Sequence, residues 1–453
     1  MPGVRLYYPV AKGRTESDAA GYAPEEDEFD PTIDDFVAKS RKYIHFDLPL
    51  SQAELGREPT ADEIRSHSFW PLLGFTIEER RLKHDKLGNK IFEKKPRDIK
   101  FGSHKDAALL EWYTRSLSLE YERFLATTNY GSSILAYRKG VGDNVTQARD
   151  LIVEIRGRGN CTAVAMDIKG FFDNISHDVL LKAIKKVLGT DRLQDHHYKI
   201  YERMTKFEWV DSAALTKRLG KNYGRHGRIC TSDEFRSIVR RRGDSLVQVN
   251  DKQPFGIPQG TPLSGLFANI ALIEFDRVMS NYTAKKGGSY RRYSDDLAFV
   301  IPNDVDETLL IAHAKRQLKR FGLIANDKKT EVSKFSSVPE ALSADRPFQY
   351  LGFVFDGKRT LIRQSSLTRY YRKMSGGVRA KIRAAKENKI PKNEIFMREL
   401  FRKYTHFGRT RNFPRYAYRA ATVLAAPEIR HQLKGHIRKF KRTVKFHLAK
   451  VYR

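Results

Sequence analysis

Cysteine is scarce in this chain, and long apolar runs are absent. Cys161 and Cys230 are the two cysteines among 453 residues, and their wide separation excludes a disulfide framework and a Cys-based zinc module. No run approaches the roughly 18 apolar residues of a membrane span, and no basic-then-apolar signal opens the chain. The 13 histidines show neither H-x3-H nor HExxH spacing. We expect a soluble, cytoplasmic protein without membrane contact.

Acidic residues are the minority charge, and they are unevenly placed. The 84 Lys and Arg against 54 Asp and Glu give a formal charge of +30. Residues 1–64 hold 14 acidic and 7 basic side chains, a net charge of −7, whereas residues 357–453 hold 28 Lys and Arg against 4 Glu, a net charge of +24. Such a basic segment is hard to keep compact without an anionic partner, which indicates nucleic acid.

The first part of the chain alternates short helix and strand signals. Thr60 and Glu63 have the spacing of a capping box that opens a helix. Further signals predict a hairpin over 82–93, a helix over 107–125 and a strand over 134–140 that ends in a basic turn. Residues 1–66 are polar and acidic, and a flexible arm, a lid and an oligomer contact all stay open for them.

The second part predicts a strand, a capped helix and a basic insertion. An apolar run over 162–168 is interrupted by Asp167, and Ser176 then caps a helix that Gly189 stops. Residues 190–250 form a basic insertion. We then expect helices over 262–278 and 305–321 and a strand pair over 350–355. From residue 365 the chain is basic, aromatic and helical.

The most informative stretch is the predicted hairpin Tyr293-Ser294-Asp295-Asp296. Strand interiors disfavour Asp, so a bare Asp pair beside an apolar strand indicates a tight turn kept for a bound cation. Two adjacent carboxylates repel each other unless a metal ion neutralises them, and oxygen ligands suit Mg²⁺. An ordinary Asp-rich turn is the alternative.

A second acidic position, Asp167, lies 128 residues before Asp295, also at the end of a strand. An isolated Asp there is commonly a turn or cap residue. Two-metal phosphoryl transfer, however, needs carboxylates from two such strand edges, which hold ions about 3.5–4 Å apart. We expect Asp167 and Asp295 to bridge two Mg²⁺ ions, with Mn²⁺ as a substitute, and Asp296 to support them.

These motifs together resemble the reverse transcriptase palm. The resemblance rests on Asp167-Ile-Lys-Gly-Phe-Phe172-Asp, then Pro258-Gln259-Gly260-Thr261-Pro262-Leu263-Ser264-Gly265, then Tyr293-Ser294-Asp295-Asp296, in that order. The form with Ile-Pro-Gln-Gly before the helix is similar to the bacterial branch, which holds retron and group II intron enzymes. The likeness covers roughly residues 90–360.

The resemblance implies an α/β right-hand polymerase with fingers, an antiparallel palm and a helical thumb. The implied division is an acidic N-terminal extension over 1–66, fingers over 67–160, a palm over 161–355 with the basic insertion at about 190–250, and a basic helical thumb over 356–453. The implied catalytic residues are Asp167, Asp295 and Asp296, and the metal ligands add Ile168. The implied nucleotide-binding residues are Arg97, Arg138, Phe172, Gln259, Gly260 and Lys329. The implied nucleic-acid-binding residues are Tyr350, Leu351, Gly352, Arg372, Lys373, Arg409 and Arg411.

Particular residues carry particular expectations. Gly260 lets the backbone approach the templating pair closely, because Gly has no side chain to clash. Phe172 stands where the family places an aromatic ring under the sugar, which favours deoxynucleotides over ribonucleotides. Arg138 can pair bidentately with phosphate. Each has an ordinary alternative: a loop before a helix, a core aromatic and a solvated turn residue, respectively.

The stretches His67-Ser-Phe-Trp-Pro71 and Gly102-Ser-His-Lys-Asp106 are most similar to stand-alone bacterial reverse transcriptases of antiviral defence. That resemblance implies dNTP substrates, a DNA product, a structured non-coding RNA as template or activator, and a role against phage. A terminal transferase on the same fold, including a protein-primed one, and an RNA-binding scaffold with a relic palm are the alternatives. The sequence leaves the oligomeric state open.

Overall fold

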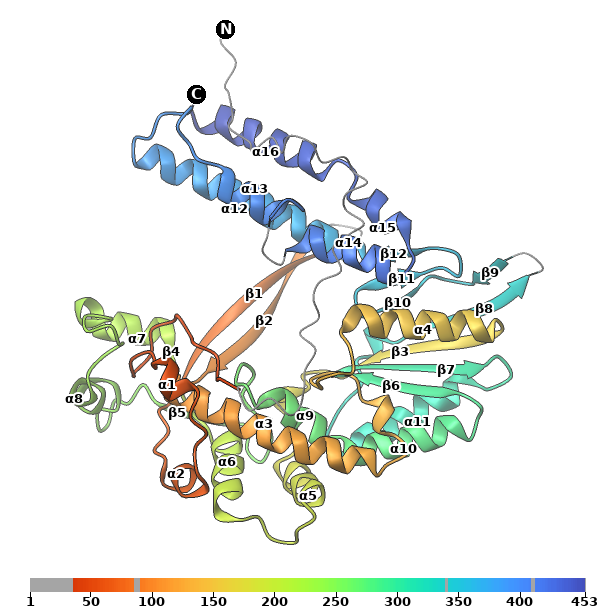
Figure 1. Ribbon diagram of the computed structural model, residues 1–453, viewed down its shortest axis with the longest axis horizontal. Coiled ribbons are helices and arrows are strands. Elements are labelled where there is room, and N and C mark those ends of the chain that lie inside the picture. The colour runs from red at the N-terminus through yellow and green to blue at the C-terminus, as the bar shows by residue number, and fades with distance from the viewer. Residues whose placement is uncertain (1–35, 85–89, 339–340, 409–411, 453) are drawn as a thin grey trace.

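The computed structural model describes residues 36–84, 90–338, 341–408 and 412–452. It confirms the α/β class, with antiparallel sheets and many helices. In Figure 1 the long hairpin β1–β2 separates a five-stranded sheet on one side from the insertion on the other, and the C-terminal helices lie across the top. No helix in the described part of the chain is long and apolar enough to cross a membrane.

The five-stranded sheet, ordered β6-β7-β3-β8-β9, is the centre of the fold. Its strands are β3 (Cys161–Asp167), β6 (Ser289–Tyr293), β7 (Asp296–Pro302), β8 (Glu331–Val338) and β9 (Ala341–Ala344). Strand β3 pairs antiparallel with β7 and β8. Side chains alternate across β3, so Val164 and Met166 enter one core and Cys161 and Ala163 enter another.

Helices cover both faces of this sheet. α4 (Asn144–Arg158) lies over one face, and α10 (Ile273–Ala284) and α11 (Glu307–Arg320) lie over the other (Figure 1). α5 (His177–Val187) packs with this second group, and it begins as predicted, with Ser176 Oγ accepting from the Val179 N–H. The sequence predicted one helix over 262–278, but the structure has α9 (Ser264–Ala271) and then α10, interrupted at Leu272.

The predicted hairpin over 82–93 is longer than expected. β1 (Leu72–His84) pairs with β2 (Lys90–Phe101) from Leu73 opposite Phe101 to His84 opposite Lys90. The predicted turn residues 87–89 lie outside the described residues. The strand predicted over 134–140 is wrong: a 3-10 turn at Gly131–Ser133 is followed by a single bridge from Ile134 to Arg292, because the segment meets the sheet edge at one position only.

The basic insertion packs around a small separate core that also includes Phe46 and Leu73. α6 (Asp195–Thr205) leads to β4 (Glu208–Asp211), α7 (Ser212–Leu219), the short α8 (Ser232–Glu234), a π-helix at Phe235–Val239 and β5 (Gln248–Val249). β4 pairs in parallel with the start of β1, which gives the sheet order β2-β1-β4-β5. The small core includes Val210, Leu215, Ile229 and Val239.

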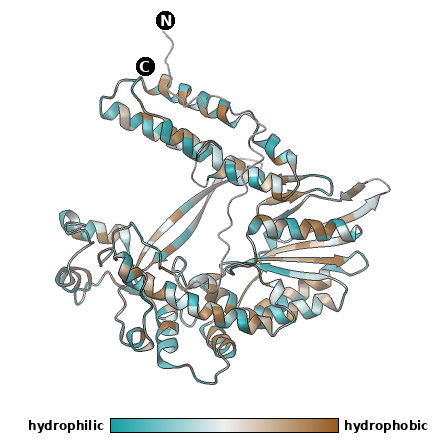
Figure 2. Ribbon diagram, viewed as in Figure 1, coloured by the Kyte–Doolittle hydropathy of each residue, from teal (hydrophilic) through white to brown (hydrophobic). Residues whose placement is uncertain are grey.

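The C-terminal region is helical, as the sequence predicted. It begins with the small sheet of β10 (Phe348–Tyr350), β11 (Phe353–Phe355) and β12 (Thr360–Ile362). The helices are α12 (Gln364–Glu387), α13 (Arg398–Tyr404), α14 (Phe413–Val423), α15 (Pro427–Gln432) and α16 (His436–Val451). Figure 2 shows hydrophilic and hydrophobic residues interleaved along α12 and α16. Their apolar residues share one core, which leaves the basic ones toward solvent.

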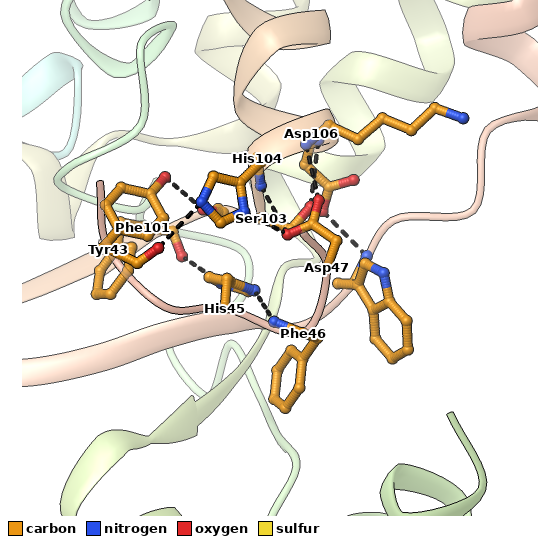
Figure 3. A network of polar contacts seen from close by, with 11 residues as sticks. Tyr43, His45, Phe46, Asp47, Phe101, Ser103, His104 and Asp106 are labelled. Atoms are coloured by element: carbon orange, nitrogen blue, oxygen red, sulfur yellow. Dashed lines mark hydrogen bonds and ion pairs between the residues drawn. The ribbon is translucent and has the colours of Figure 1, made fainter. Parts of the chain in front are cut away.

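The described N-terminal segment packs on α3 (His104–Ala126) instead of standing apart. The backbone N–H groups of His104 and Lys105 donate to Asp47 at 2.9 and 2.8 Å, and the His104 ring nitrogens lie 2.8 Å from Asp47 Oδ1 and 3.0 Å from the Tyr43 carbonyl (Figure 3). Asp47 thereby satisfies donors at the helix start. The helices α1 (Gln52–Leu55) and α2 (Ala61–Ser66) follow, and the capping box of Thr60 and Glu63 is confirmed.

The two stretches that suggested defence enzymes meet in the same network. Asp106 Oδ1 lies 2.7 Å from His67 Nε2, and Asp106 Oδ2 accepts from the Trp70 N–H at 3.0 Å. The Asp106 side chain is 1% exposed. These residues therefore hold the chain between α2 and β1 against α3. The four-part domain division stays a prediction, and the bonds from His104 and Lys105 to Asp47 join its first part to its second.

We expect Asp106→Ala to lower the free energy of unfolding by about 3 kcal/mol, because it leaves the buried His67 ring and Trp70 N–H without their acceptor. Urea denaturation measures the change. Asp62→Ala is the control, since that side chain is 87% exposed, and its effect should stay within about 0.5 kcal/mol. Equal effects of the two substitutions would contradict the role assigned to Asp106.

Candidate active site

The strand pairing brings the three predicted carboxylates to one end of the central sheet. Asp167, the last residue of β3, is directly opposite Asp296, the first residue of β7. The Ile168 N–H donates to the Asp295 carbonyl at 2.9 Å. Between β6 and β7 the chain turns through Ser294, whose φ of 60° is in the left-handed region. Antiparallel register thus places residues from two distant sequence motifs side by side.

Asp167 is held by the segment that leads into β8. The Asn326 N–H donates to the Asp167 carbonyl at 2.7 Å, and Asn326 Nδ2 donates to Asp167 Oδ1 at 3.0 Å. The Lys329 ammonium forms an ion pair with Asp167 Oδ2. Sequence reasoning singled out Lys329 in this loop but missed Asn326, for which residue type alone gave no signal. Both residues come from a short 3-10 helix at Asp327–Lys329 and the residue before it.

The carboxylates influence each other electrostatically. Burial, followed by the negative charges of Asp295 and Asp167, raises the pKa of Asp296 to about 7. The positive charges of Lys329 and Arg363 act in the opposite direction without cancelling this effect. The end of the sheet therefore carries negative charge in excess of its local cations.

An excess of carboxylate oxygens fits a hard divalent cation. Within the described residues, no three His, Cys, Asp or Glu side chains are already grouped as ligands around one point. Asp167 is instead directed to Lys329 and Asn326. The donor chemistry thus suits Mg²⁺ or Mn²⁺, and a cation that used Asp167 would compete with Lys329 for the same carboxylate.

A fully buried ion pair supports the turn. Arg292 Nε and Nη2 donate to the two carboxylate oxygens of Asp276 at 2.8 and 2.6 Å, and both side chains are 0% exposed. Arg292 Nη1 donates to Asn269 Oδ1 at 3.0 Å and reaches the Ser294 carbonyl at 3.4 Å. Tyr290 Oη donates to Asp276 at 2.7 Å. Arg292 therefore ties β6, α9 and α10 to the Asp295–Asp296 turn.

Burial alone would lower the pKa of Arg292, but the adjacent Asp276 charge more than offsets this and raises the pKa, which keeps the guanidinium charged. The sequence analysis did not identify the buried role of Arg292. The alternation of burial along β6, which places Tyr290 and Arg292 on the inner side, is the signal that could have found it.

Tyr137 connects the segment after α3 to the turn. Its backbone has a φ of 58°, and its hydroxyl lies 3.1 Å from Ser294 Oγ. A Cβ on Gly265 would lie 2.6 Å from the Tyr137 ring, so glycine is required at that position for the ring to fit. The sequence analysis placed this position only within the predicted strand over 134–140.

Gln259 and Gly260 adjoin the end of β2. The Lys100 N–H donates to the Gln259 carbonyl at 2.8 Å. Gly260 has a φ of 124°, and a Cβ there would lie 2.8 Å from the Lys100 carbonyl oxygen. In this structure the close approach that requires glycine is made by the β2 backbone. The predicted approach to a templating pair stays a prediction.

Phe172 contacts the chain just before the Gln259 loop, and Arg97 lies on β2, the strand that the loop adjoins. Phe172 is half-buried against the core, and its carbonyl accepts from the Ile257 N–H at 2.9 Å. Phe171 beside it is buried, as predicted. Arg97 is exposed on β2, opposite Ile77. Their nucleotide contacts stay predictions.

Arg138 is engaged within the protein. Its guanidinium donates to both carboxylate oxygens of Glu122 at 2.8 and 2.6 Å and to the carbonyls of Gly131 and Ile134. The side chain is only 10% exposed. A contact with a triphosphate would require these bonds to break, so we assign Arg138 a structural contact here and leave its phosphate contact as a prediction.

The predicted nucleic-acid residues lie at two places. Tyr350 is buried, and Leu351 and Gly352 form the turn after it with φ of 45° and 93°. The Gly352 carbonyl accepts from the N–H of Arg363, the residue before α12, at 2.9 Å. The other place is the solvent side of α12, where Arg372 and Lys373 are exposed. Arg409 and Arg411 lie outside the described residues.

Comparison with known families matches residues 236–355 to the reverse transcriptase (RNA-dependent DNA polymerase) family. The matched segment includes the Gln259 loop, the Asp295–Asp296 turn and the Tyr350 strand. The family so described consists of RNA-directed DNA polymerases, which are nucleotidyltransferases. Comparison with curated proteins finds no match.

Among solved structures, the chain is similar to telomerases of two yeasts. Apo telomerase from Candida tropicalis truncated from its C-terminal domain has a TM-score of 0.40 and 12% identity over 63% of this chain and 55% of that one. Telomerase from Candida albicans with a TWJ fragment of telomeric RNA has a TM-score of 0.37 and 13% identity, over 86% of this chain and 62% of that one. Apo telomerase from Candida tropicalis has a TM-score of 0.36 and 13% identity, over 84% of this chain and 64% of that one. The chain thus spans less than two thirds of each of these chains.

We expect Arg292→Met to lower the free energy of unfolding by about 3–5 kcal/mol, because it leaves the Asp276 charge buried and unpaired. The double substitution Arg292→Met with Asp276→Leu should recover most of that loss, since no buried charge remains. Thermal or urea unfolding measures both.

Arg277→Met on the same helix is the control for this pair. Its side chain is 47% exposed and pairs with Glu274, so the expected loss is below about 1 kcal/mol. A single Arg292→Met variant as stable as this control would show that the buried pair does not support the turn.

Proposed function

We propose that the protein is a reverse transcriptase that copies an RNA template into DNA from dNTPs. The observation that carries the proposal is the pairing of Asp167 with Asp296 across β3 and β7, with Asp295 in the adjoining turn. The family match over residues 236–355 supports the same activity. Carboxylates from two strand edges are what two-metal nucleotidyl transfer requires.

Asp167, Asp295 and Asp296, with Ile168 beside them, would hold the divalent ions, Mg²⁺ or Mn²⁺. When bound, such ions supply Lewis-acid stabilisation of the attacking 3′-oxygen and the pyrophosphate leaving group. Asn326 orients the Asp167 carboxylate through its side chain and holds the Asp167 carbonyl through its backbone N–H. Lys329, paired with Asp167, places a positive charge at the edge of the cluster, where it would meet the triphosphate.

The bound nucleotide would lie among the loop of Gln259 and Gly260, Phe172 and Arg97. Ile257 connects this loop to Phe172. It lies two residues before Gln259, and its N–H donates to the Phe172 carbonyl. A bulky ring under the sugar would collide with a ribose 2′-hydroxyl, so Phe172 favours deoxynucleotides. The template–product duplex would lie against the Tyr350–Gly352 turn and the basic side of α12.

The biological setting that we propose is bacterial antiviral defence in the cytoplasm, with a structured non-coding RNA as template or activator. Its support is the sequence likeness of the stretches 67–71 and 102–106 to defence-associated enzymes. In the structure both stretches contribute to the network around Asp106. Sequencing the nucleic acid that copurifies with the protein tests this part of the proposal.

Substituting the acidic residues tests the activity. Asp295→Asn or Asp167→Asn should reduce divalent-ion-dependent dNTP incorporation by on the order of 10³-fold, or about 4 kcal/mol of barrier. Asp304→Asn, which lies just beyond the other end of β7 and is exposed, should leave it unchanged. Primer extension with labelled dNTPs measures the rates, and thermal unfolding confirms that each variant is folded.

The products separate the alternatives. A product complementary to the added RNA supports reverse transcription, whereas homopolymeric or random sequence would indicate a terminal transferase. Full function in cells after both Asp substitutions would indicate a non-enzymatic scaffold.

Substituting Phe172 tests sugar discrimination. Phe172→Ala should raise the incorporation of ribonucleotides relative to deoxynucleotides by roughly 10–100-fold, because the ring that excludes the 2′-hydroxyl is removed. The measurement is the ratio of kcat/KM for the two nucleotides with the same base. Phe171→Leu, at the neighbouring buried position, is the control and should leave this ratio unchanged. If the wild type and Phe172→Ala gave equal ratios, Phe172 would not contact the nucleotide sugar.

A further inference from the structure

The basic insertion is a structural unit attached to the far side of β1. Parallel pairing of Leu72 with Trp209 and of Gly74 with Asp211 joins β4 to β1. A Cβ on Gly74 would lie 2.5 Å from the Trp209 ring, so the indole packs directly on the β1 backbone. Figure 1 shows α7 and α8 at the edge of the molecule, across β1–β2 from the central sheet. None of this unit's residues belongs to the candidate active site.

The unit carries more positive charge than its own fold uses. Residues 206–252 contain 11 Lys and Arg against 6 Asp and Glu. Three arginines are matched by neighbouring carboxylates: Arg218 with Asp244, Arg236 with Asp233, and Arg240 with Glu208. Within the described part of the chain, Lys217, Lys221, Arg241 and Arg242 form no such ion pair, and all four are exposed.

Arg218 joins the two chain segments that carry these four residues. Its guanidinium donates to the Asp244 carboxylate at 3.1 Å and to the Asp244 carbonyl at 3.3 Å. The end of α7 is thereby fixed against the turn that follows the π-helix. Lys217 and Lys221 lie next to and three residues after Arg218, and Arg241 and Arg242 begin the turn that the Asp244 N–H closes by donating to the Arg241 carbonyl at 3.1 Å. We call these four side chains the insertion surface.

The chemistry of the insertion surface favours the backbone of a duplex over a single strand. Single-strand sites combine cations with exposed aromatic rings on which bases stack. All four aromatic residues in 206–252, namely Phe207, Trp209, Tyr223 and Phe235, are buried or half-buried. Clustered Lys and Arg without stacking rings bind phosphates, and they recognise double-stranded RNA by its shape and backbone.

We propose that the insertion surface binds the phosphate backbone of a double-stranded segment of the RNA partner, outside the polymerase site. The RNA identity of the partner rests on the proposed function, whereas the phosphate chemistry rests on the surface itself. A structured RNA held here could be retained while its single-stranded part enters the active site. The surface would thus select templates by the presence of a stem instead of by sequence.

The test uses the full chain and a labelled RNA hairpin with a stem of about 16 base pairs, the length that double-stranded RNA modules cover. Lys217→Ala, Arg241→Ala and Arg242→Ala are combined in one variant. We expect its affinity to fall at least 10-fold at 0.15 M salt. The slope of log affinity against log salt should fall by about 2–3, because each lost phosphate contact removes roughly one unit. Fluorescence anisotropy measures both quantities.

The control variant carries Lys285→Ala, Arg316→Ala and Lys319→Ala, three exposed cations on or beside α10 and α11. Its charge change is equal, and these helices lie at the opposite side of the molecule in Figure 1. Equal weakening in both variants would show that net charge alone is responsible and would overturn the proposal. An unchanged affinity and slope in the insertion variant would also overturn it and would favour an acidic protein partner.

Primer extension on a short RNA–DNA template–primer without a stem separates this proposal from the proposed function. The insertion variant should keep the wild-type kcat on that substrate while losing its preference for a template that carries a stem. If the wild-type protein bound the hairpin but did not polymerise dNTPs, the proposed function would be contradicted. The proposal that the insertion surface binds double-stranded RNA would still hold.

Discussion

The antiparallel register of β3 and β7 is the constraint on which the rest of the site depends. It places Asp167 opposite Asp296, and a shift by one residue would send every side chain of β3 to the other face of the sheet. Such a shift would exchange Val164 and Met166 with Cys161 and Ala163 between two cores of different composition. The hydrophobic interior therefore fixes the position of the carboxylates, although the carboxylates themselves repel each other. Packing energy stabilises an arrangement that electrostatics alone would oppose.

The buried ion pair of Arg292 and Asp276 fixes the position of the turn that carries Asp295. Desolvating two charges is costly, and hydrophobic residues of similar volume commonly give equal or greater stability. The pair provides geometry instead: a planar guanidinium that contacts Asp276, Asn269 and the Ser294 carbonyl at once. Asn269 also donates through Nδ2 to the Ala136 carbonyl at 2.6 Å. One buried cation thus sets the distances among a helix, a strand, a loop and the turn that carries Asp295.

Local sequence pattern predicted the elements whose signals are local. The caps at Thr60 and Ser176, the strand ending at Asp167 and the Asp295–Asp296 turn follow from residue types at short spacing. The contacts of Asn326, Arg292 and Arg138 did not, because their partners lie far away in sequence or on another element. Arg138 was expected to face phosphate, yet Glu122 one helix earlier neutralises it. The interruption at Leu272 and the packing of residues 36–66 on α3 likewise depend on tertiary contacts.

Two L-residues with left-handed backbone, Tyr137 and Ser294, touch each other through their hydroxyls. Each such conformation costs on the order of 1–3 kcal/mol and persists only where its surroundings enforce it. Because each one is part of the other's surroundings, relaxation of either would release both. The loop after α3 and the hairpin that carries Asp295 and Asp296 should accordingly lose their order as one cooperative unit, so that damage to the loop is transmitted to the carboxylates without any change in the sheet.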